Sequence, residues 1–275
     1  MKAAAFEYVR PAGLKDALAI LAEGRGSARP IAGGQSLGPM LNLRLVRPDM
    51  LVDIARLHEL SRVEDLGQSW LVGAAITHAA LEDGTTLVGP GGMISHVARG
   101  IAYRAVRNRG TVGGGLAHAD SAADWPLAFG ALGAIVHVAS ASGERRVPIA
   151  SLITGPFETV LRDGELITGV EIPKPSARAR WGYYKVCRKV GEFPDASAAV
   201  VLDPDRGWGT AILGALSGPP RAIPDVASRM ASGGERPSRD VLADAVATAA
   251  PELDEVARHL YVGALCRAVA QACHA

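Results

Sequence analysis

The sequence is poor in cysteine and in aromatic residues. It has 3 cysteines among 275 residues, Cys187, Cys266 and Cys273, and no CxxC pair. An odd number at wide spacing excludes both a disulfide framework and an iron–sulfur ligand set. Any such cluster that serves this protein must therefore be carried by another chain. Aromatic residues make up 5%, whereas the 32 glycines predict many tight turns and close backbone approaches.

Neither sign of charge dominates the chain. It has 29 Lys+Arg and 28 Asp+Glu, a net charge of +1, so there is no basic excess for binding nucleic acid. Apolar stretches are interrupted well before the roughly 18 residues that a membrane span requires. Glu7 and Arg10 interrupt the apolar start of the chain, so we expect no signal peptide and a cytoplasmic location.

The chain divides into three segments of globular composition, with 48% apolar and 21% charged residues. We expect an α/β unit over 1–57, a second unit over 58–176 and an α+β domain over 177–275. Apolar periodicity predicts a set of helices, which are 14–24, 77–83 with Thr77 as N-cap, 94–106, 124–134 with Asp124 as N-cap, 238–250 and 253–275. Alternation predicts a set of strands, which are 29–32, 41–46, 50–54, 69–76, 134–140, a strand ending at Pro173, 182–189, 196–202 and 209–220.

Two glycine motifs carry the candidate chemistry, Ile31-Ala32-Gly33-Gly34-Gln35-Ser36-Leu37 and the segment 107–115, RNRGTVGGG. Consecutive glycines allow positive φ and direct successive N–H groups into one concavity, where they can hold a phosphate. Gln35, Ser36 and Thr111 add side-chain donors. Two such loops would clasp the diphosphate of a dinucleotide from opposite sides. The alternative is that both are ordinary turns. Neither matches GxGxxG or GxxxxGK[ST], which excludes the Rossmann and P-loop fingerprints.

Two other readings of these segments are open. Residues 34–38 match GxSxG, the nucleophile elbow of serine hydrolases, with Ser36 as nucleophile and His118 with Asp120 or Asp124 as partners. An elbow should follow a core strand and precede a long helix, and here a strand-like segment follows instead. His118 and the two aspartates also resemble a metal site, but no second histidine lies at i+4, so a polar loop with a helix cap is favoured and no metal is expected.

Four segments together resemble a known family: AGGQSLGPMLNLRLVRP, VRNRGTVGGGLAHADSAAD, GELITGVEIP and YYKVCRKVGEF. They are similar, in order and spacing, to the FAD-binding medium subunit of the molybdenum hydroxylases, the relatives of carbon monoxide dehydrogenase and xanthine dehydrogenase. The resemblance runs from residue 1 to about 270. It implies an α+β chain with the PCMH/vanillyl-alcohol-oxidase-type FAD-binding fold, in which two α/β subdomains precede a C-terminal α+β domain.

The resemblance also implies which residues bind the cofactor. The residues of the two motifs would hold the FAD diphosphate, and these are Ile31, Ala32, Gly33, Gly34, Gln35, Ser36, Leu37, Thr111, Val112, Gly113, Gly114 and Gly115. The other residues would lie near the flavin nucleotide or its ring, and these are Ile101, Asp124, Leu166, Ile167, Lys185 and Phe193. Gly115 replaces the Ser or Asn common in the family, and the residues around Pro194 differ from the usual pattern.

The implied function is electron transfer. Substrate would be hydroxylated at molybdopterin on a large partner subunit, and electrons would pass through [2Fe-2S] clusters of a small subunit to noncovalent FAD on this chain. An acceptor such as a quinone or oxygen would follow, and Phe193 beside the ring would disfavour NAD. The chain itself would have no catalytic residue and would assemble in a dimer of heterotrimers. A stand-alone flavin-binding module is the alternative.

Overall fold

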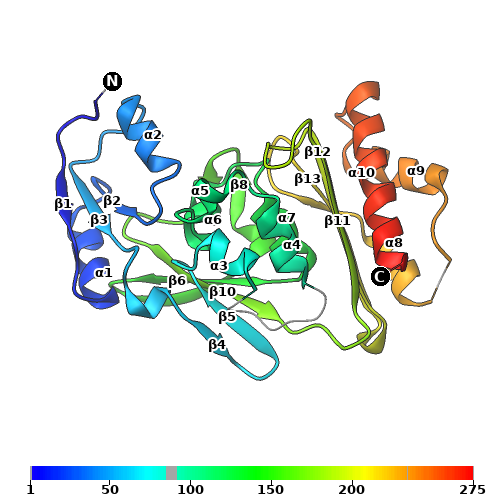
Figure 1. Cartoon of the computed structure of the whole chain (residues 1–275), viewed down its shortest axis with the longest axis horizontal. Helices are drawn as coiled ribbons and strands as arrows, with labels where there is room; N and C mark the ends of the chain where they lie inside the picture. Colours follow the sequence, from blue (N-terminus) through cyan, green and yellow to red (C-terminus); the bar gives the residue numbers. More distant parts are fainter. Residues whose placement is uncertain (1, 85–91, 234, 275) are drawn as a thin grey trace.

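The computed structural model describes residues 2–84, 92–233 and 235–274 (Figure 1). The chain begins with a three-stranded parallel sheet of order β1-β3-β2, formed by β1 (Glu7–Val9), β3 (Met50–Asp53) and β2 (Ala28–Ile31). Helix α1 (Leu14–Glu23) connects β1 to β2 and buries an apolar stripe. Gly24 ends this helix, which confirms the predicted helix over 14–24.

The predicted strand over 41–46 is wrong. Residues Leu37–Asn42 form helix α2, whose first bonds run from the Gly38 and Met40 N–H groups to the carbonyls of Gly34 and Ser36. The chain then turns through a positive φ at Arg44. The alternating leucines misled the prediction because the side chains of Leu43 and Leu45 are exposed rather than packed in a core.

The middle of the chain forms a five-stranded antiparallel sheet of order β4-β5-β10-β6-β7. Its strands are β4 (Val63–Asp65), β5 (Ser69–Gly73), β10 (Leu166–Pro173), β6 (Ile135–Ser140) and β7 (Gly143–Pro148). Short helices lie over one face (Figure 1), namely α3 (His78–Glu82), α4 (Met93–Arg99), α5 (Arg104–Arg107), α6 (Val112–His118) and α7 (Asp124–Ala131). A small hairpin, β8 (Ile153–Gly155) and β9 (Glu158–Thr159), precedes β10.

The single helix predicted over 94–106 is two helices, α4 and α5. Gly100 ends α4, and Ala102 adopts a positive φ of 43°. The break lets Ile101 pair with Gly191 of the last segment. That approach is close, because a Cβ on Gly191 would lie 2.4 Å from the Ala102 oxygen. The apolar periodicity therefore predicted one continuous helix, whereas a tertiary contact overrides helix propensity at Ile101.

The last segment forms a four-stranded antiparallel sheet of order β11-β12-β13-β14. The strands are β11 (Arg180–Val186), β12 (Ala196–Asp203), β13 (Trp208–Gly214) and β14 (Arg221–Ala222), and helices α8 (Pro224–Ala231), α9 (Arg239–Ala249) and α10 (Glu255–His274) complete it. Figure 1 shows this sheet between α7 and α10, and β12 is buried along its whole length as expected for a strand covered on both faces.

No helix in the described ranges combines the length and apolarity needed to cross a bilayer. The first sheet and α1 pack on the second, since their core includes Ala75, Ala139 and Leu166. The second and third sheets share a core as well, in which Phe129 and Leu127 of α7 join Ile212 of β13. The domain boundaries expected near residues 57 and 176 stay a prediction.

Candidate functional site

The two glycine motifs meet at the carboxyl end of β2. Residues 32–36 leave this strand and lead into α2, and Gly33 packs directly on the second motif. A Cβ at Gly33 would lie 1.9 Å from the Arg109 oxygen and 2.9 Å from the Gly110 Cα. Thr77 and Thr111 form a β-bridge beside this contact. The sequence expectation that the two motifs lie together is consistent with this geometry.

The first motif presents free backbone donors. Gly34 has a φ of +69°, a conformation that glycine adopts without a steric penalty. The N–H groups of residues 33–36 donate no hydrogen bond within the described parts of the chain, and these residues are half-buried or exposed. Successive unpartnered N–H groups beside a positive φ form an anion-binding concavity.

The glycines of the second motif, residues 107–115, do not form the predicted N–H concavity, which corrects that expectation. Thr111 caps helix α6, and its Oγ1 accepts from the Gly114 N–H. The N–H groups of Val112 and Gly113 donate to the carbonyls of Ile76 and Ala74, and residues 113–115 have no positive φ. A Cβ at Gly113 would lie 2.5 Å from the Ala74 Cβ. Glycine is thus needed here for packing, while Gly114 is exposed.

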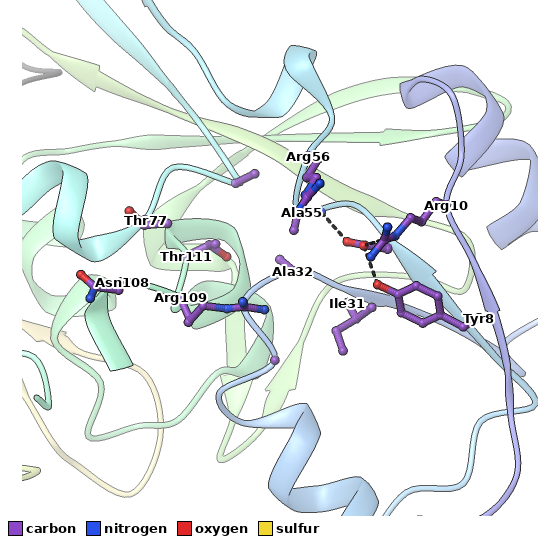
Figure 2. Close-up of a pocket in the computed structure, with 14 residues that line it drawn as sticks. Tyr8, Arg10, Ile31, Ala32, Ala55, Arg56, Thr77, Asn108, Arg109 and Thr111 are labelled. Carbon is purple, nitrogen blue, oxygen red and sulfur yellow. Dashed lines mark hydrogen bonds and ion pairs between the residues drawn. The ribbon is translucent and has the colours of Figure 1, made fainter. Parts of the chain in front are cut away.

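A cavity of about 350 Å³ lies between the motifs. Figure 2 shows the glycine loop at its centre, with Asn108, Arg109 and Thr111 on one side and Tyr8 and Arg10 on the other. The lining also includes polar and small residues at the strand ends and on the α3 turn, namely Ile31, Ala32, Gly33, Gly34, Asp53, Ala55, Arg56, Ala75 and Thr77. Leu37, Gln35 and Ser36 continue the loop just outside this lining.

A buried ion pair that the sequence analysis missed holds the second motif. The Arg107 side chain is 10% exposed and donates through Nε and Nη2 to both oxygens of Glu82, at 2.7 and 3.0 Å. Its Nη1 donates to the carbonyls of Ile101 and Ala102. Arg107 therefore ties the motif to α3 and to the turn between α4 and α5. The sequence does show an arginine four residues before Thr111, but no sequence pattern predicts that Glu82 is its partner.

A buried histidine lies under both halves of the second motif. Trp125 Nε1 donates to His78 Nδ1 at 3.0 Å, and a Cβ at Gly110 would meet the imidazole at 2.8 Å. Burial, assisted by the charge of Arg107, lowers the pKa of His78 to about 4. The ring is therefore neutral at physiological pH and acts as a hydrogen-bond acceptor.

Asp124 does not cap α7, which corrects that prediction. It is the first helical residue, Ala123 holds the cap position, and the buried carboxylate accepts from elsewhere. Tyr183 Oη donates to Oδ1 at 2.5 Å, and Lys185 Nζ donates to Oδ1 at 3.1 Å and to the Gly100 carbonyl at 2.7 Å. Burial raises the pKa of Asp124, while Lys185 and the Tyr183 hydroxyl oppose that rise. Burial and the adjacent carboxylate raise the pKa of Tyr183.

The other predicted residues lie in three places. Ile101 lies next to the Lys185 contact through Gly100, so the structure brings Ile101, Asp124 and Lys185 together. Leu166 and Ile167 have buried side chains. Their backbone pairs with β6, whereas β5 pairs with β10 only from Gly169 onward. Phe193 is 65% exposed in the loop after β11.

The structure does not support a hydrolytic site. Ser36 is exposed at the start of α2, and its hydroxyl makes no hydrogen bond to a histidine in the described chain. His118 instead contacts the ring of Phe157, with centroids 5.1 Å apart, and Asp120 accepts from the Ala122 N–H. In the described ranges no group of three or more His, Cys, Asp or Glu side chains is arranged to hold a metal.

The residues present fit a dinucleotide cofactor such as FAD. The concavity of residues 33–36 supplies unpartnered N–H donors for a diphosphate, and the small side chains of the cavity leave the backbone open to a close approach. The buried Asp124 carboxylate and the Lys185 ammonium place polar groups away from this cavity, on α7 and β11.

Comparisons with known proteins agree with this geometry. Residues 4–175 match the family model of the FAD binding domain in molybdopterin dehydrogenase. The nicotine 6-hydroxylase medium subunit of Paenarthrobacter nicotinovorans is 38% identical over 203 residues, 74% of this chain and 70% of that protein. The carbon monoxide dehydrogenase medium chain of Afipia carboxidovorans is 35% identical over 197 residues, 72% and 68% of the two chains.

Solved structures are similar over the whole chain. A chain of quinoline 2-oxidoreductase from Pseudomonas putida 86 superposes with a TM-score of 0.89 at 32% identity, covering 100% of this chain and 99% of that one. A chain of carbon monoxide dehydrogenase from Oligotropha carboxidovorans gives a TM-score of 0.91 at 30% identity, with 99% of each chain covered. The last hundred residues, which lie outside the family model, are thus included in the structural likeness.

Proposed function

Because this chain belongs to the FAD-binding medium subunits of the molybdenum hydroxylases, we propose that it carries electrons between a partner's [2Fe-2S] clusters and an external acceptor. The FAD-binding domain and membership of an oxidoreductase complex follow from the family. The direction of electron flow, the acceptor and the assembly as a dimer of heterotrimers are part of the proposal. The three cysteines are free, as is common in reducing compartments, which supports a cytoplasmic location.

The observation that carries the proposal is the free-donor concavity of residues 33–36 beside the second motif. There the backbone would hold the diphosphate, with Asn108, Arg109 and Thr111 of the second motif as the facing wall; a direct contact from Val112, Gly113, Gly114 or Gly115 stays part of the proposal. Ile101, Asp124, Lys185 and the backbone of Leu166 and Ile167 would hold the flavin half. FAD supplies reversible electron transfer at its isoalloxazine ring when bound, and the chain's own role is to bind it, orient it and tune its potential.

The experiment is made on the chain and on its complex. The purified chain should contain noncovalent FAD that denaturation releases. Co-expression with a molybdopterin-binding subunit and a [2Fe-2S] subunit, which we expect in neighbouring genes, should give one complex on gel filtration. A colourless chain that cannot be reconstituted with FAD would refute the proposal. FMN, or a flavin that remains attached after denaturation, would refute the noncovalent FAD assignment.

The acceptor is tested separately. We propose a quinone, a dye or oxygen rather than NAD, because no second nucleotide motif accompanies the first and Phe193 would cover the ring. Reduced complex should be reoxidised faster by a quinone analogue than by NAD in stopped flow. Equal rates would contradict the proposed acceptor, and an unchanged preference in Phe193→Ala would contradict the shielding role of that residue.

A further inference from the structure

One wall of the cavity lies outside both glycine motifs. It is formed where the parallel strands β1 and β3 end, by Tyr8, Arg10, Asp53 and Arg56. Ligands commonly bind outside the carboxyl ends of parallel strands. This wall faces the second motif across the glycine loop, as Figure 2 shows.

Asp53 holds Arg10 in place. Its Oδ2 accepts from Tyr8 Oη at 2.5 Å and from Arg10 Nε at 3.2 Å, and its Oδ1 accepts from the Ala55 N–H at 3.0 Å. Burial raises the pKa of Asp53. The hydrogen bonds from Tyr8 and Ala55 and the charge of Arg10 lower this pKa by more than burial raises it, so the net shift is downward. The carboxylate therefore stays ionised. The Arg10 guanidinium also contacts Tyr8, through a side-chain hydrogen bond and over its ring, whose centroid lies 5.5 Å from the guanidinium carbon.

The cavity also holds two cations without a carboxylate partner. Arg56 and Arg109 line it and form no ion pair with any described carboxylate. Figure 2 shows Arg109 reaching toward the glycine loop from the opposite wall. Three arginines against one aspartate leave a formal charge of +2 on the lining. A dinucleotide diphosphate carries one negative charge on each phosphate, so the charges match.

We propose that Arg10, Arg56 and Arg109 clamp the diphosphate of FAD, and that Asp53 and Tyr8 are positioning residues that fix Arg10. Guanidinium groups suit this task because they stay charged and donate in a fork that matches phosphate oxygens. The inference rests on the proposed function. It goes further in making the first sheet, and not only the two glycine motifs, responsible for selecting a flavin that has a diphosphate.

The test is a titration of the flavin-free full chain with FAD and with riboflavin, followed by flavin fluorescence. Arg56→Gln, Arg10→Gln and Arg109→Gln should each raise the FAD Kd roughly tenfold, the loss expected for a charge-assisted hydrogen bond. The riboflavin Kd should stay unchanged in each variant. Rising salt should reduce the difference in FAD Kd between the wild type and each variant, because salt screens the charges. Arg236→Gln, which removes the same charge from an exposed site outside the cavity, is the control and should bind FAD as the wild type does.

A double-mutant cycle tests the positioning residue. Asp53→Asn should weaken FAD binding in the wild-type background and add nothing when Arg10 is already Gln. Additive effects would show that Asp53 supports only the fold and would overturn its positioning role. Wild-type FAD affinity in all three arginine variants would overturn the clamp while leaving the proposed function intact. Failure of the wild-type chain to bind FAD would overturn both.

Discussion

The α-carbon of Gly33 lies against the backbone carbonyl of Arg109, so close that a Cβ at Gly33 would be 1.9 Å from that oxygen. The obstacle is backbone rather than a flexible side chain. Gly33→Ala should therefore separate the motifs, cost about 1–3 kcal/mol of unfolding free energy and lower FAD content. Urea denaturation and flavin absorbance would measure both effects.

Gly38 provides the matched control for this prediction. It lies in α2, and a Cβ there would meet nothing within 4 Å. Gly38→Ala should therefore be neutral or stabilise the chain by up to about 1 kcal/mol, since alanine favours a helix over glycine. Equal stability of Gly33→Ala and Gly38→Ala would contradict the packing argument.

Neighbouring glycines of the second motif should respond differently. Gly114 is exposed, and a Cβ there would meet only the Thr111 hydroxyl at 2.9 Å, so Gly114→Val should fold while losing FAD if this surface faces the cofactor. Gly113→Ala should instead lose about 1–3 kcal/mol of stability, because its Cβ would collide with Ala74. Circular dichroism melts and flavin content distinguish the two. Normal FAD content in Gly114→Val would remove residue 114 from the proposed site.

Arg107 and Arg104 both contact Glu82 but differ in exposure. The Arg107 side chain is 10% exposed, whereas that of Arg104 is 48% exposed. Arg107→Gln should cost about 3–5 kcal/mol, because it leaves Glu82 and two carbonyls without their buried partner. Arg104→Gln should cost less than about 1 kcal/mol. Similar losses in the two variants, measured by urea denaturation, would show that burial does not control this network.

His78 should make stability depend on pH. Its folded pKa of about 4 lies below the unfolded value of 6.5, so the unfolded chain binds the proton more readily, and stability falls as pH drops from about 6.5 toward 4. At pH 5 this group should contribute about 2 kcal/mol less than at pH 7.5. His78→Asn retains an acceptor for Trp125 and should reduce that difference. His58→Asn, at an exposed site, should keep the wild-type pH dependence, and an equal slope in both variants would exclude His78 as its source.

Local patterns predicted the elements whose signals are local. The helix over 14–24 ends at a glycine as expected, Thr77 caps α3 through its hydroxyl, and the strands near residues 50 and 196 are present. The errors occur where long-range contacts decide the backbone. Residues 41–46 have no neighbouring strand to pair with, and residues 100–103 leave the helix so that Ile101 can pair with Gly191.

The candidate site shows the same division. The composition of the two motifs led to the prediction that they serve one concavity. Only the structure shows that residues 33–36 offer free N–H groups, whereas the N–H groups of residues 112–115 donate within the chain. The Asp124 cap was mispredicted because an aspartate before a helix usually caps it, whereas here Tyr183 and Lys185 compete for the carboxylate. Arg10, Arg56 and Asp53 carry no motif at all, since strands that are distant in sequence bring them together. The binding roles of the predicted residues stay predictions.

The partners of Asp124 limit how this chain can be divided. The family model ends at residue 175, yet Tyr183 and Lys185 both follow it, and Phe129 on α7 shares its core with Ile212 of β13. A fragment ending at residue 175 would leave the Asp124 carboxylate without its partners Tyr183 and Lys185. It would also expose the face of α7 that β12 and β13 cover. A gene fusion or domain swap that cuts at the edge of the matched domain is therefore expected to yield insoluble protein, whereas one that moves the whole chain keeps both shared cores intact.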